Sequence, residues 1–590
     1  MLMHLTGISS SSENSSRGSA GAGRTVLLLL FLILLMLPPY LVFLGRPSPV
    51  RSMETVCMQT SMDTWLRQCE GEAGAWQTPS STGGFPRIEK PPLLVWLNMI
   101  AWRDLNPETA TIEQIAWRAR LVTVALVMLG AIAACWAGCT LGNPRAGLLA
   151  ALITGTSALV LKHGHYATYD AQLMGWTALA VAAALWAMQP GRPDRRGRHA
   201  AGWLISGIAL GAGIMTKGPV ALTWVLPPLA LAIVLIPRNR LRNCGGLLVT
   251  LLLAAALSSW WYLHVVHWIS NAPQVLHGEY QRIDIDQNRP LYYYALIVLF
   301  ILPWTPWWVL SWFQPFREMA PDRRPQLWLA WGWGLGTFAL AAAFPMRHDR
   351  YLVPLMPALA VMSALQLDSL VERCRHERAS PWLRRLWFCL WGVFLAASVI
   401  FPLGIALQEL LVRHRMLDAV QITGINGLGC CAAALALATL ACFGIKAVRT
   451  DRFLAATYLA GTWTVLAATV LYFGYAQSDR QLFRQRADAE RMAAACVGLP
   501  VFYFTGPPAG MPAPSKGLFM FSKRVIRPAD LAQLRALRDS GRGFSVMATP
   551  EAGISAHFSD FGLQRVLDFD DGRRKWSLFT AVATAAPGKR

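Results

Sequence analysis

Long apolar runs separated by short basic segments dominate this sequence and place the strongest limit on its fold. The first run covers residues 25–44, and similar runs follow near 120–141, 146–162, 171–189, 200–215, 220–236, 244–265, 291–313, 326–345, 351–369, 386–407, 420–445 and 453–474. A run of about 17–25 apolar residues is long enough to cross the bilayer as a helix. With 54% hydrophobic and only 15% charged residues, the chain is too apolar for a soluble multidomain protein. The sequence therefore predicts a polytopic all-α membrane protein with about thirteen transmembrane helices.

The net charge of +21 reflects membrane topology rather than nucleic-acid binding. The arginines cluster between apolar runs, for example within 192–198, 238–242 and 373–385, and the clusters fall in every second loop. By the positive-inside rule these loops are cytoplasmic. The segments 46–119, 163–170, 216–219, 266–290, 346–350 and 408–419 then face outward, and the C-terminus lies on the same outer side.

Composition divides the chain into three regions. Residues 1–24 are rich in Ser and Gly and are expected to form a disordered cytoplasmic tail. Residues 25–474 carry the transmembrane runs together with the outer segment 46–119, whose apolar part at 92–102 is expected to lie along the membrane surface. Residues 475–590 alternate β-rich runs (VFYF, LFMFS, FSVMA, RVLDF, WSLFTAV) with helical stretches such as PADLAQLRALRDSG. They predict a small extracytoplasmic α/β domain.

The eleven cysteines lie mostly inside apolar runs, without CxxC pairs or zinc-like spacing. Cys57 and Cys69 belong to an outward segment. Either they form a local disulfide or they remain two free thiols.

Ionisable side chains gather at the outer ends of the predicted spans. The set comprises Glu54, Glu89, Lys90, Asp170, Lys217, Arg347, His348, Asp349 and Arg350. Charged groups at the membrane boundary are costly unless they face a cavity or a partner. Because they come from separate outward segments, we expect them to converge on one cleft.

Several motifs occur in a fixed order along most of the chain. They are SMETVCM (52–58), FPRIEKPPLLVWL (85–97), ATYDAQL (167–173), MTKGPVAL (215–222), RPLYYYALIVLFILPW (289–304) and RHDRYLVPLMPALA (347–360). In this order the chain resembles the lipid-dependent glycosyltransferases of the protein-mannosyltransferase and aminoarabinose-transferase type, the membrane GT-C class. The resemblance implies a GT-C fold in the inner membrane. It also implies transfer of one sugar from a polyprenyl-phosphate donor to lipid A, another glycan or lipid, or a protein at the outer, periplasmic face.

The resemblance also implies an acidic catalytic base in the first outer loop, commonly the aspartate of an Asp-Glu pair. Met53 stands at that aspartate position here, and Glu54 remains. Three alternatives follow: Glu54 is the base, Asp170 is the base, or the activity is altered or lost. Glu54 as a cap of a loop helix, and Asp170 as the N-cap of the next span, are the structural alternatives.

Cations near the departing phosphate are the second requirement of such a transfer. Lys90 is the first choice for the donor phosphate, beside Glu89 in the EKPP motif. Arg347 and Arg350, together with Tyr351, match the family's donor-site helix, and Lys217 is a second-tier phosphate residue. The structural alternatives are a Glu89–Lys90 surface ion pair, membrane anchoring by the two arginines, and helix termination at Lys217.

No metal or other cofactor is predicted to be required, although a divalent metal stays an alternative. Some relatives place a metal near the EKPP glutamate with a histidine whose position is Gln287 here, and His264, His267 and His277 show no ligand spacing. A transporter or flippase of a lipid-linked glycan and a non-catalytic relative are the rival functions. Transporters usually place acids at the bilayer midplane and show inverted repeats, whereas the acids here lie at span ends.

The tryptophans are expected to lie mostly in the interfacial belt. Examples are Trp260, Trp261, Trp304, Trp307 and Trp308.

Overall fold

The computed structural model describes residues 15–42, 44, 52–81, 85–189, 195–236, 239–281, 290–321, 323–344, 347–376, 381–413, 427–474, 480–496, 498–505, 513–549, 561–571 and 574–581. The chain divides into two compact units. The first comprises Met1–Leu44, Thr123–Tyr262 and Gly278–Ala476, and the second Gly45–Val122, Leu263–His277 and Gln477–Arg590. The outer segment 46–119, assigned above to the transmembrane region, thus belongs to the same compact unit as the C-terminal domain.

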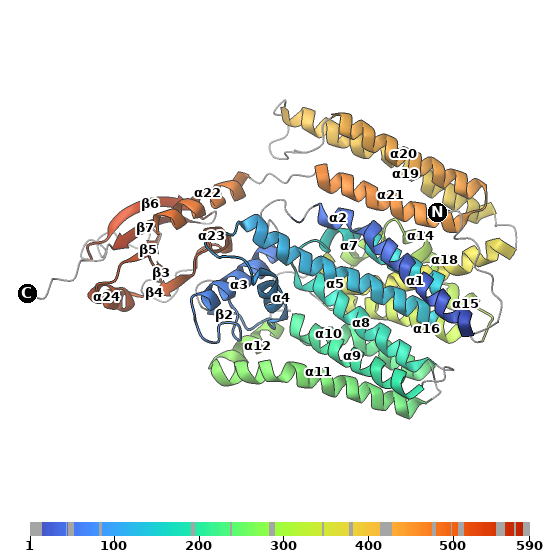
Figure 1. Ribbon diagram of the computed structural model, residues 1–590, viewed down its shortest axis with the longest axis horizontal. Helices are drawn as coiled ribbons and strands as arrows, with labels where there is room; N and C mark the ends of the chain where they lie inside the picture. The colour runs from blue at the N-terminus through green and yellow to red at the C-terminus, as the bar shows by residue number, and fades with distance from the viewer. Residues whose placement is uncertain are drawn as a thin grey trace, which may run out of the picture. The chain divides into compact units, whose positions relative to one another are not determined.

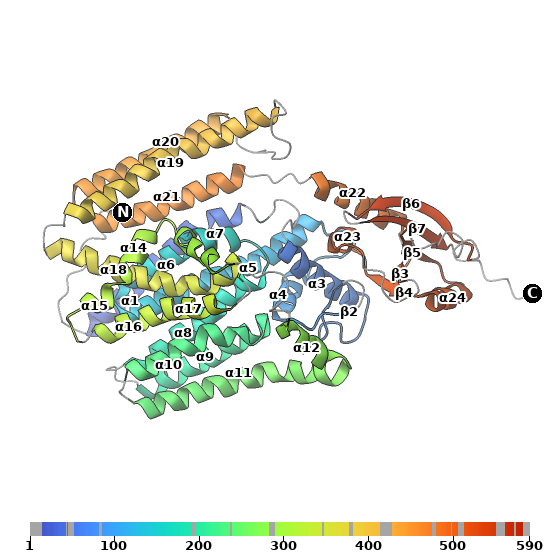
Figure 2. The same cartoon turned by 180° about the vertical axis from the view of Figure 1, so that it is seen from behind.

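The first unit is helical. Its elements are α1 (Ser15–Met36), α2 (Pro38–Leu41), α6 (Pro144–Thr156), α7 (Ala158–His163), α8 (Tyr169–Met188), α9 (Arg195–Lys217), α10 (Val220–Leu235), η3 (Leu291–Leu296), α13 (Ile297–Phe300), α14 (Thr305–Ser311), α15 (Gln314–Arg317), α16 (Arg324–Trp331), η4 (Gly332–Gly336), α17 (Thr337–Ala343), η5 (Asp349–Leu355), α18 (Met356–His376), α19 (Pro381–Arg413), α20 (Gly427–Arg449) and α21 (Phe453–Gly474), with most of α5 (Ile112–Leu141) and α11 (Arg240–Trp268). Figures 1 and 2 show α8, α9 and α10 side by side, and likewise α19, α20 and α21.

Nine helices in the described part of the chain are long and apolar enough to cross a membrane, or up to ten if one bent pair is a single span. The polytopic all-α fold is therefore confirmed. The remaining predicted segments are also helical, but they are short or interrupted. Segment 146–162 divides into α6 and α7, 220–236 becomes the 16-residue α10, 291–313 bends by 115°, and 326–345 is broken by the π-helical turn η4.

The N-terminal helix begins earlier than predicted. α1 starts at Ser15, so the last part of the expected disordered tail is helical, while residues 1–14 lie outside the described residues. α1 ends shortly before Pro38 and Pro39, because proline has no N–H to donate the hydrogen bond that would continue the helix.

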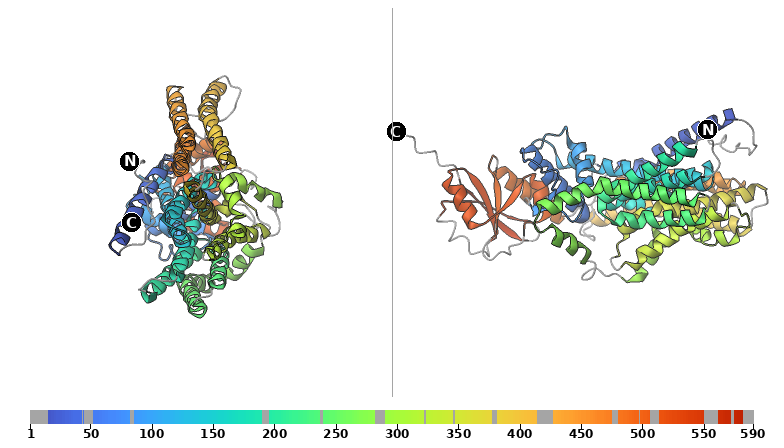
Figure 3. Two further views of the ribbon diagram at one scale, coloured as in Figure 1. Left: turned by 90° about the vertical axis from the view of Figure 1, so that its right-hand side faces the viewer. Right: turned by 90° about the horizontal axis from the view of Figure 1, so that it is seen from below.

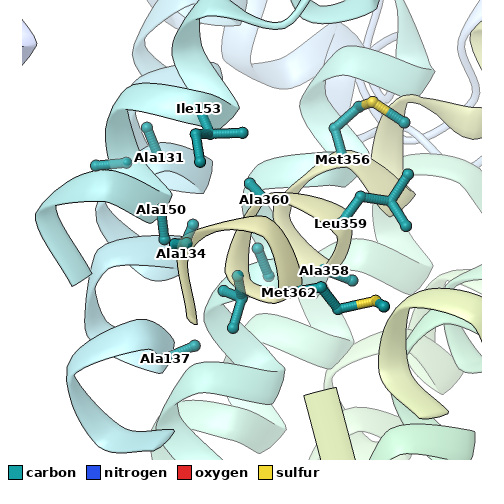
Figure 4. Packing of buried hydrophobic residues seen from close by; sticks show 14 of the residues in the cluster. Ala131, Ala134, Ala137, Ala150, Ile153, Met356, Ala358, Leu359, Ala360 and Met362 are labelled. Atoms are coloured by element: carbon teal, nitrogen blue, oxygen red, sulfur yellow. The ribbon is translucent and has the colours of Figure 1, made fainter. Parts of the chain in front are cut away.

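Small residues let the central helices of the first unit approach closely. Figure 4 shows the alanines of α5 and α6 in the same core as Met356, Leu359 and Met362 of α18. A Cβ atom added at Gly147 would lie 2.3 Å from Cys139 Sγ and 2.6 Å from the Cys135 carbonyl oxygen. Without a strong hydrophobic drive between helices in lipid, such close van der Waals packing stabilises the bundle.

The expectation of an interfacial tryptophan belt is wrong for most of the residues it named. Trp261, Trp304, Trp307 and Trp308 are at most 1% exposed, whereas Trp260 is 40% exposed. Trp304 Nε1 donates to Thr156 Oγ1 at 2.9 Å, so its polar atom finds a partner inside the bundle.

The second unit combines segment 46–119 with the C-terminal domain. It contains α3 (Ser52–Cys69), β1 (Ser80–Ser81), β2 (Phe85–Pro86), α4 (Leu93–Trp102), the first residues of α5, part of α12 (Ala272–Gln281), α22 (Arg480–Ala495), α23 (Lys516–Ser522), α24 (Leu531–Asp539) and the strands β3 (Val501–Phe504), β4 (Ile526–Ala529), β5 (Phe544–Ala548), β6 (Gln564–Asp570) and β7 (Lys575–Ala581). Figure 3 shows the larger sheet as a twisted fan.

The five-stranded sheet has the order β4-β3-β5-β7-β6. Strand β3 pairs in parallel with β4 and β5, and β7 pairs antiparallel with β5 and β6. The predicted small α/β domain is therefore confirmed. One of its elements was wrong, because LFMFS, expected as a β-rich run, forms α23. The Ser515 side chain accepts from Leu518 N and caps that helix.

The two outer-segment cysteines cannot bridge within one chain. Cys57 and Cys69 lie on the same helix, α3, and no disulfide joins them. At about 1.5 Å per residue they are separated by roughly 18 Å along the helix axis, far beyond disulfide geometry.

Replacing Gly147 by alanine is expected to destabilise the bundle, because the added Cβ overlaps α5. A loss of about 1–3 kcal/mol is typical of such overpacking. Thermal unfolding of the detergent-solubilised protein measures it. Gly245→Ala is the matched control, since this helical glycine is exposed and has nothing within 4 Å of its added Cβ. Equal melting temperatures for the two variants would contradict the packing argument.

Candidate functional site

Asp170 lies in the first turn of α8, and the whole residue is only 2% exposed. The N-cap position of this helix is Thr168, so the interpretation of Asp170 as the N-cap is wrong. The Asp170 carboxylate instead accepts a hydrogen bond from Lys217 Nζ. Its Oδ2 atom also forms an ion pair with Arg350 Nε at 3.7 Å. Three segments distant in sequence therefore meet at one buried carboxylate.

Lys217 is held at this place by the way α9 ends. It is the last residue of the helix, and Gly218 follows with a φ of +84°. A left-handed residue directly after a helix is the usual position for glycine, which has no Cβ to clash. Lys217 Nζ lies 4.3 Å from the centre of the Tyr351 ring. The TKGP motif thus directs the lysine toward both the acid and an aromatic face.

Arg350 and Tyr351 belong to η5, a short 3₁₀ helix. The guanidinium carbon of Arg350 lies 5.2 Å from the centre of the Tyr351 ring. Both cations therefore contact the same ring, which favours positive charge over its face. Asp170, Lys217, Arg350 and Tyr351 are called the Asp170 cluster below.

The Asp170 cluster has two cations for one acid and hence one net positive charge. The Asp170 side chain is 3% exposed, whereas those of Lys217 and Arg350 are 14% and 21% exposed. The acid is therefore enclosed while the cations retain open surface. Lys and Arg side chains are the usual protein ligands for phosphate. An anion can bind here without removing the partner that stabilises the buried acid.

Arg347 makes a different contact from Arg350. Its guanidinium donates to the Ala342 carbonyl oxygen, at 3.1 Å from Nη2 and 3.3 Å from Nε. Since Ala342 lies in the last turn of α17, this contact satisfies a helix-end carbonyl. The phosphate role of Arg347 stays a prediction.

Asp349, the residue before Arg350, joins η5 to α7. It forms ion pairs with Lys162 and, at 3.2 Å, with His163 Nε2. Lys162 and His163 were missed in the sequence because they stand at the end of an apolar run. A lysine and a histidine in the last turn of a helix were the available signal, since cations are favoured there.

In the second unit, Glu54 is paired with Arg120. Arg120 Nε donates to Glu54 Oε1 at 2.8 Å and Nη2 to Oε2 at 3.0 Å. The exposed fractions of the two side chains are 1% for Arg120 and 0% for Glu54. Both carboxylate oxygens are therefore engaged in a buried bidentate pair. This geometry gives Glu54 a structural role and offers no open surface to an incoming hydroxyl.

Glu89 and Lys90 lie between β2 and α4 in the second unit. Within the described residues, Glu89 Oε2 is buried without a hydrogen-bond partner and its carboxylate forms no ion pair. The proposed Glu89–Lys90 surface ion pair is therefore not formed. Nearby, Arg87 Nη1 donates to Thr60 Oγ1 at 3.0 Å and to the Val56 carbonyl at 3.3 Å, which ties the EKPP motif to α3.

Over the ranges that the structure describes, no group of three His, Cys, Asp or Glu side chains could hold a metal ion. His264 and His267 instead lie against the Trp268 ring, at 6.1 and 5.4 Å between ring centres. Gln287 lies outside the described residues.

Comparisons with known proteins support the resemblance seen in the motifs. Residues 101–270 match the family model described as dolichyl-phosphate-mannose-protein mannosyltransferase. An undecaprenyl phosphate-alpha-4-amino-4-deoxy-L-arabinose arabinosyl transferase of Pseudomonas aeruginosa is 28% identical over 247 residues, 40% of this chain and 42% of that protein. A transferase of the same name from Enterobacter sp. is 24% identical over 368 residues, 59% of this chain and 62% of that protein. The chain spans about half the length of the curated relatives that it matches.

The solved structures cover more of the chain. ArnT from Cupriavidus metallidurans bound to undecaprenyl phosphate superimposes with a TM-score of 0.65 at 19% identity, covering 96% of this chain and 99% of that one. The chain shares the fold of this ArnT structure. An oligosaccharyltransferase of Archaeoglobus fulgidus shares less, with a TM-score of 0.52 at 12% identity over 86% of this chain and 65% of that one. The predicted GT-C fold and the resemblance to the aminoarabinose-transferase type are confirmed.

Breaking the Glu54–Arg120 pair is expected to destabilise the protein strongly. Arg120→Met removes the bidentate partner of a buried carboxylate, and removing one member of a buried ion pair typically costs about 3–5 kcal/mol. The double variant Glu54→Met/Arg120→Met should recover much of this loss, since an apolar pair leaves no buried charge. Melting temperatures and expression levels measure the cycle. A double variant no more stable than Arg120→Met alone would contradict a role of the pair in stability.

Proposed function

We propose that this chain is a glycosyltransferase that moves one monosaccharide from a polyprenyl-phosphate donor to an acceptor. The single observation that carries the proposal is the Asp170 cluster, which presents partly exposed Lys217 and Arg350 around a buried acid. Its net positive charge suits a phosphate monoanion or dianion. The named ligand of the ArnT structure, undecaprenyl phosphate, is a lipid of this chemical class.

In this reaction the bond between the sugar and the phosphate oxygen breaks while a bond to the acceptor oxygen forms. Negative charge develops on the departing prenyl phosphate, and cations aimed at that charge lower the barrier. Lys217 and Arg350 supply this charge, and the Asp170 carboxylate together with the Tyr351 ring fixes their direction. The phosphate-binding roles that the resemblance implies for Lys90, Glu89 and Arg347 stay separate predictions.

A base near the acceptor hydroxyl completes the mechanism. Of the two acids proposed for this role, Asp170 is better placed than Glu54. A substrate that contacts the open surfaces of Lys217 and Arg350 comes next to Asp170, whereas the Arg120 partner of Glu54 is itself buried. Asp170 therefore serves as the base or as the group that orients the attacking oxygen.

The acceptor is lipid A, another glycan or lipid, or a protein, and the relatives named arabinosyl transferases favour an aminopentose donor. The arginine-rich loops orient the protein in the inner membrane with the site and the C-terminal domain toward the periplasm. No metal is assigned a role.

Transport of a lipid-linked glycan and a non-catalytic function are the competing proposals. A flippase moves the donor without breaking the sugar–phosphate bond, and a non-catalytic relative binds the donor without forming product. Incubation of the purified protein in lipid nanodiscs with undecaprenyl-phosphate sugars and lipid A distinguishes them. Mass spectrometry should detect a lipid A species heavier by one sugar residue.

Removing either cation of the cluster should slow transfer. Lys217→Met and Arg350→Met are each expected to lower kcat/KM about 100-fold, as is typical when one group that stabilises a developing oxyanion is removed. Arg384→Met is the matched control, because Arg384 forms an exposed ion pair with Asp451. Wild-type turnover in both cluster variants would refute the proposed phosphate site.

The two candidate bases are separated by conservative substitutions. Asp170→Asn should reduce kcat by at least about 100-fold, in the range of general-base catalysis, whereas Glu54→Gln should change stability more than turnover. The transfer assay and thermal unfolding are measured on the same preparations. Loss of turnover in a stably folded Glu54→Gln protein, with Asp170→Asn active, would reverse the assignment.

A further inference from the structure

Asp349 occupies an unusual position for an acid. It directly precedes the phosphate-binding residue Arg350, and a carboxylate beside a phosphate site opposes anion binding by its charge. Neither the motif resemblance nor the comparisons assign it a role. Its contacts indicate why the acid is present.

The Asp349 carboxylate makes three contacts through two oxygens. Oδ2 pairs with Lys162 and with His163 Nε2, both at the end of α7, and Oδ1 accepts a hydrogen bond from the Arg350 backbone N–H at 2.8 Å. The Asp349 side chain is 19% exposed, and that of His163 is 8% exposed. The carboxylate therefore joins the end of α7 to the start of η5 in a mostly enclosed setting.

The element that Asp349 holds has little rigidity of its own. η5 is a seven-residue 3₁₀ helix with Pro354 inside it. Such helices have poorer hydrogen-bond geometry than α-helices, so their ends depend on side-chain contacts. Successive residues of η5 are anchored to different helices: Asp349 to α7, Arg350 to Asp170 of α8, and Tyr351 to Lys217 of α9.

We infer that Asp349, held by Lys162 and His163, is a positioning residue that fixes Arg350 and Tyr351 for binding the prenyl phosphate. This inference rests on the proposed function. Asp349 does not touch the phosphate; it sets the backbone from which Arg350 extends. Lys162 and His163 act through Asp349 by keeping its carboxylate in place.

A positioning role and a simple charge effect predict opposite changes in phosphate affinity when Asp349 is replaced by Asn. Asp349→Asn removes a negative charge near the phosphate site, so electrostatics alone predicts tighter binding of an anion. Loss of the α7 anchor predicts weaker binding, because Arg350 is no longer held toward its ligand. Undecaprenyl phosphate itself is the probe, and its Kd is measured by isothermal titration calorimetry in detergent.

We expect Asp349→Asn to raise the Kd about five- to tenfold, within the range of coupling between contacting residues. Asp349→Glu, which keeps the charge, should lie closer to the wild type. The same direction should appear in KM for the undecaprenyl-phosphate sugar, with a smaller change in kcat. An unchanged or lowered Kd for a folded Asp349→Asn protein would overturn the inference.

Asp368→Asn is the matched control. Asp368 accepts from Arg145 and Asn143 in another partly buried ion-pair cluster of the first unit. It stands twelve residues beyond Met356, the first residue of α18, or roughly 18 Å along the helix at about 1.5 Å per residue. Asp368→Asn should lower the melting temperature without changing the Kd. A Kd raised equally in both variants would show a general loss of stability and overturn the inference.

Lys162→Met tests the anchor from its more exposed side, and it decides the question if Asp349→Asn does not fold. The Lys162 side chain is 46% exposed, so its removal is less disruptive. Lys162→Met alone should raise the Kd, and where Asp349→Asn folds, adding Lys162→Met to it should cause no further rise. Additive effects would show that Lys162 acts independently of Asp349, and no effect at all would oppose the anchor.

Different binding results would contradict the proposed function and the positioning role of Asp349. If the wild type does not bind undecaprenyl phosphate, or if Lys217→Met binds it with unchanged affinity, the proposed phosphate site is wrong. If Lys217→Met weakens binding and Asp349→Asn does not, the site stands and only the positioning role of Asp349 is wrong.

Discussion

A carboxylate enclosed in an apolar helical bundle must be paired, and the pairing of Asp170 determines how the site is built. Unpaired, such a charge is expensive in a medium that cannot solvate it. Lys217 and Arg350 remove this cost, and they come from the end of α9 and from η5. The need to satisfy one buried charge therefore brings three segments together, and the excess of one cation leaves the site prepared for an anion.

The second unit uses the same rule for a different purpose. Glu54 and Arg120 form a bidentate pair, with both carboxylate oxygens bonded and both side chains buried. This pair leaves no residual charge for a ligand. The pair gives Glu54 a role in the stability of the second unit that does not depend on which acid carries the catalytic proton transfer.

Apolar run length and motif order predicted the transmembrane fold and the candidates Asp170, Lys217, Arg350 and Tyr351. Alternating β-rich and helical stretches predicted the C-terminal α/β domain. They did not predict where runs break. Residues 146–162 read as one continuous span, yet the chain leaves the helical region at Ser157, whose backbone is extended. LFMFS reads as a strand by its aromatic content, but the Ser515 cap and complete burial of 518–522 favour a helix.

The sequence also did not reveal which charged side chains pair with one another across the fold. Arg120 stands at the start of an apolar run and was read as part of it, although an arginine in such a place needs an acidic partner. That partner, Glu54, lies 66 residues away. Lys162 and His163 were similarly hidden, because their partner Asp349 follows almost two hundred residues later. Local patterns reveal which charges are costly, but tertiary structure decides which of them meet.

The most direct test of the account is a structure of the protein determined with undecaprenyl phosphate bound. The account predicts phosphate density within about 3 Å of Lys217 Nζ or the Arg350 guanidinium, with Asp170 still paired to the same cations. A head group bound elsewhere, in contact with neither side chain, would contradict it.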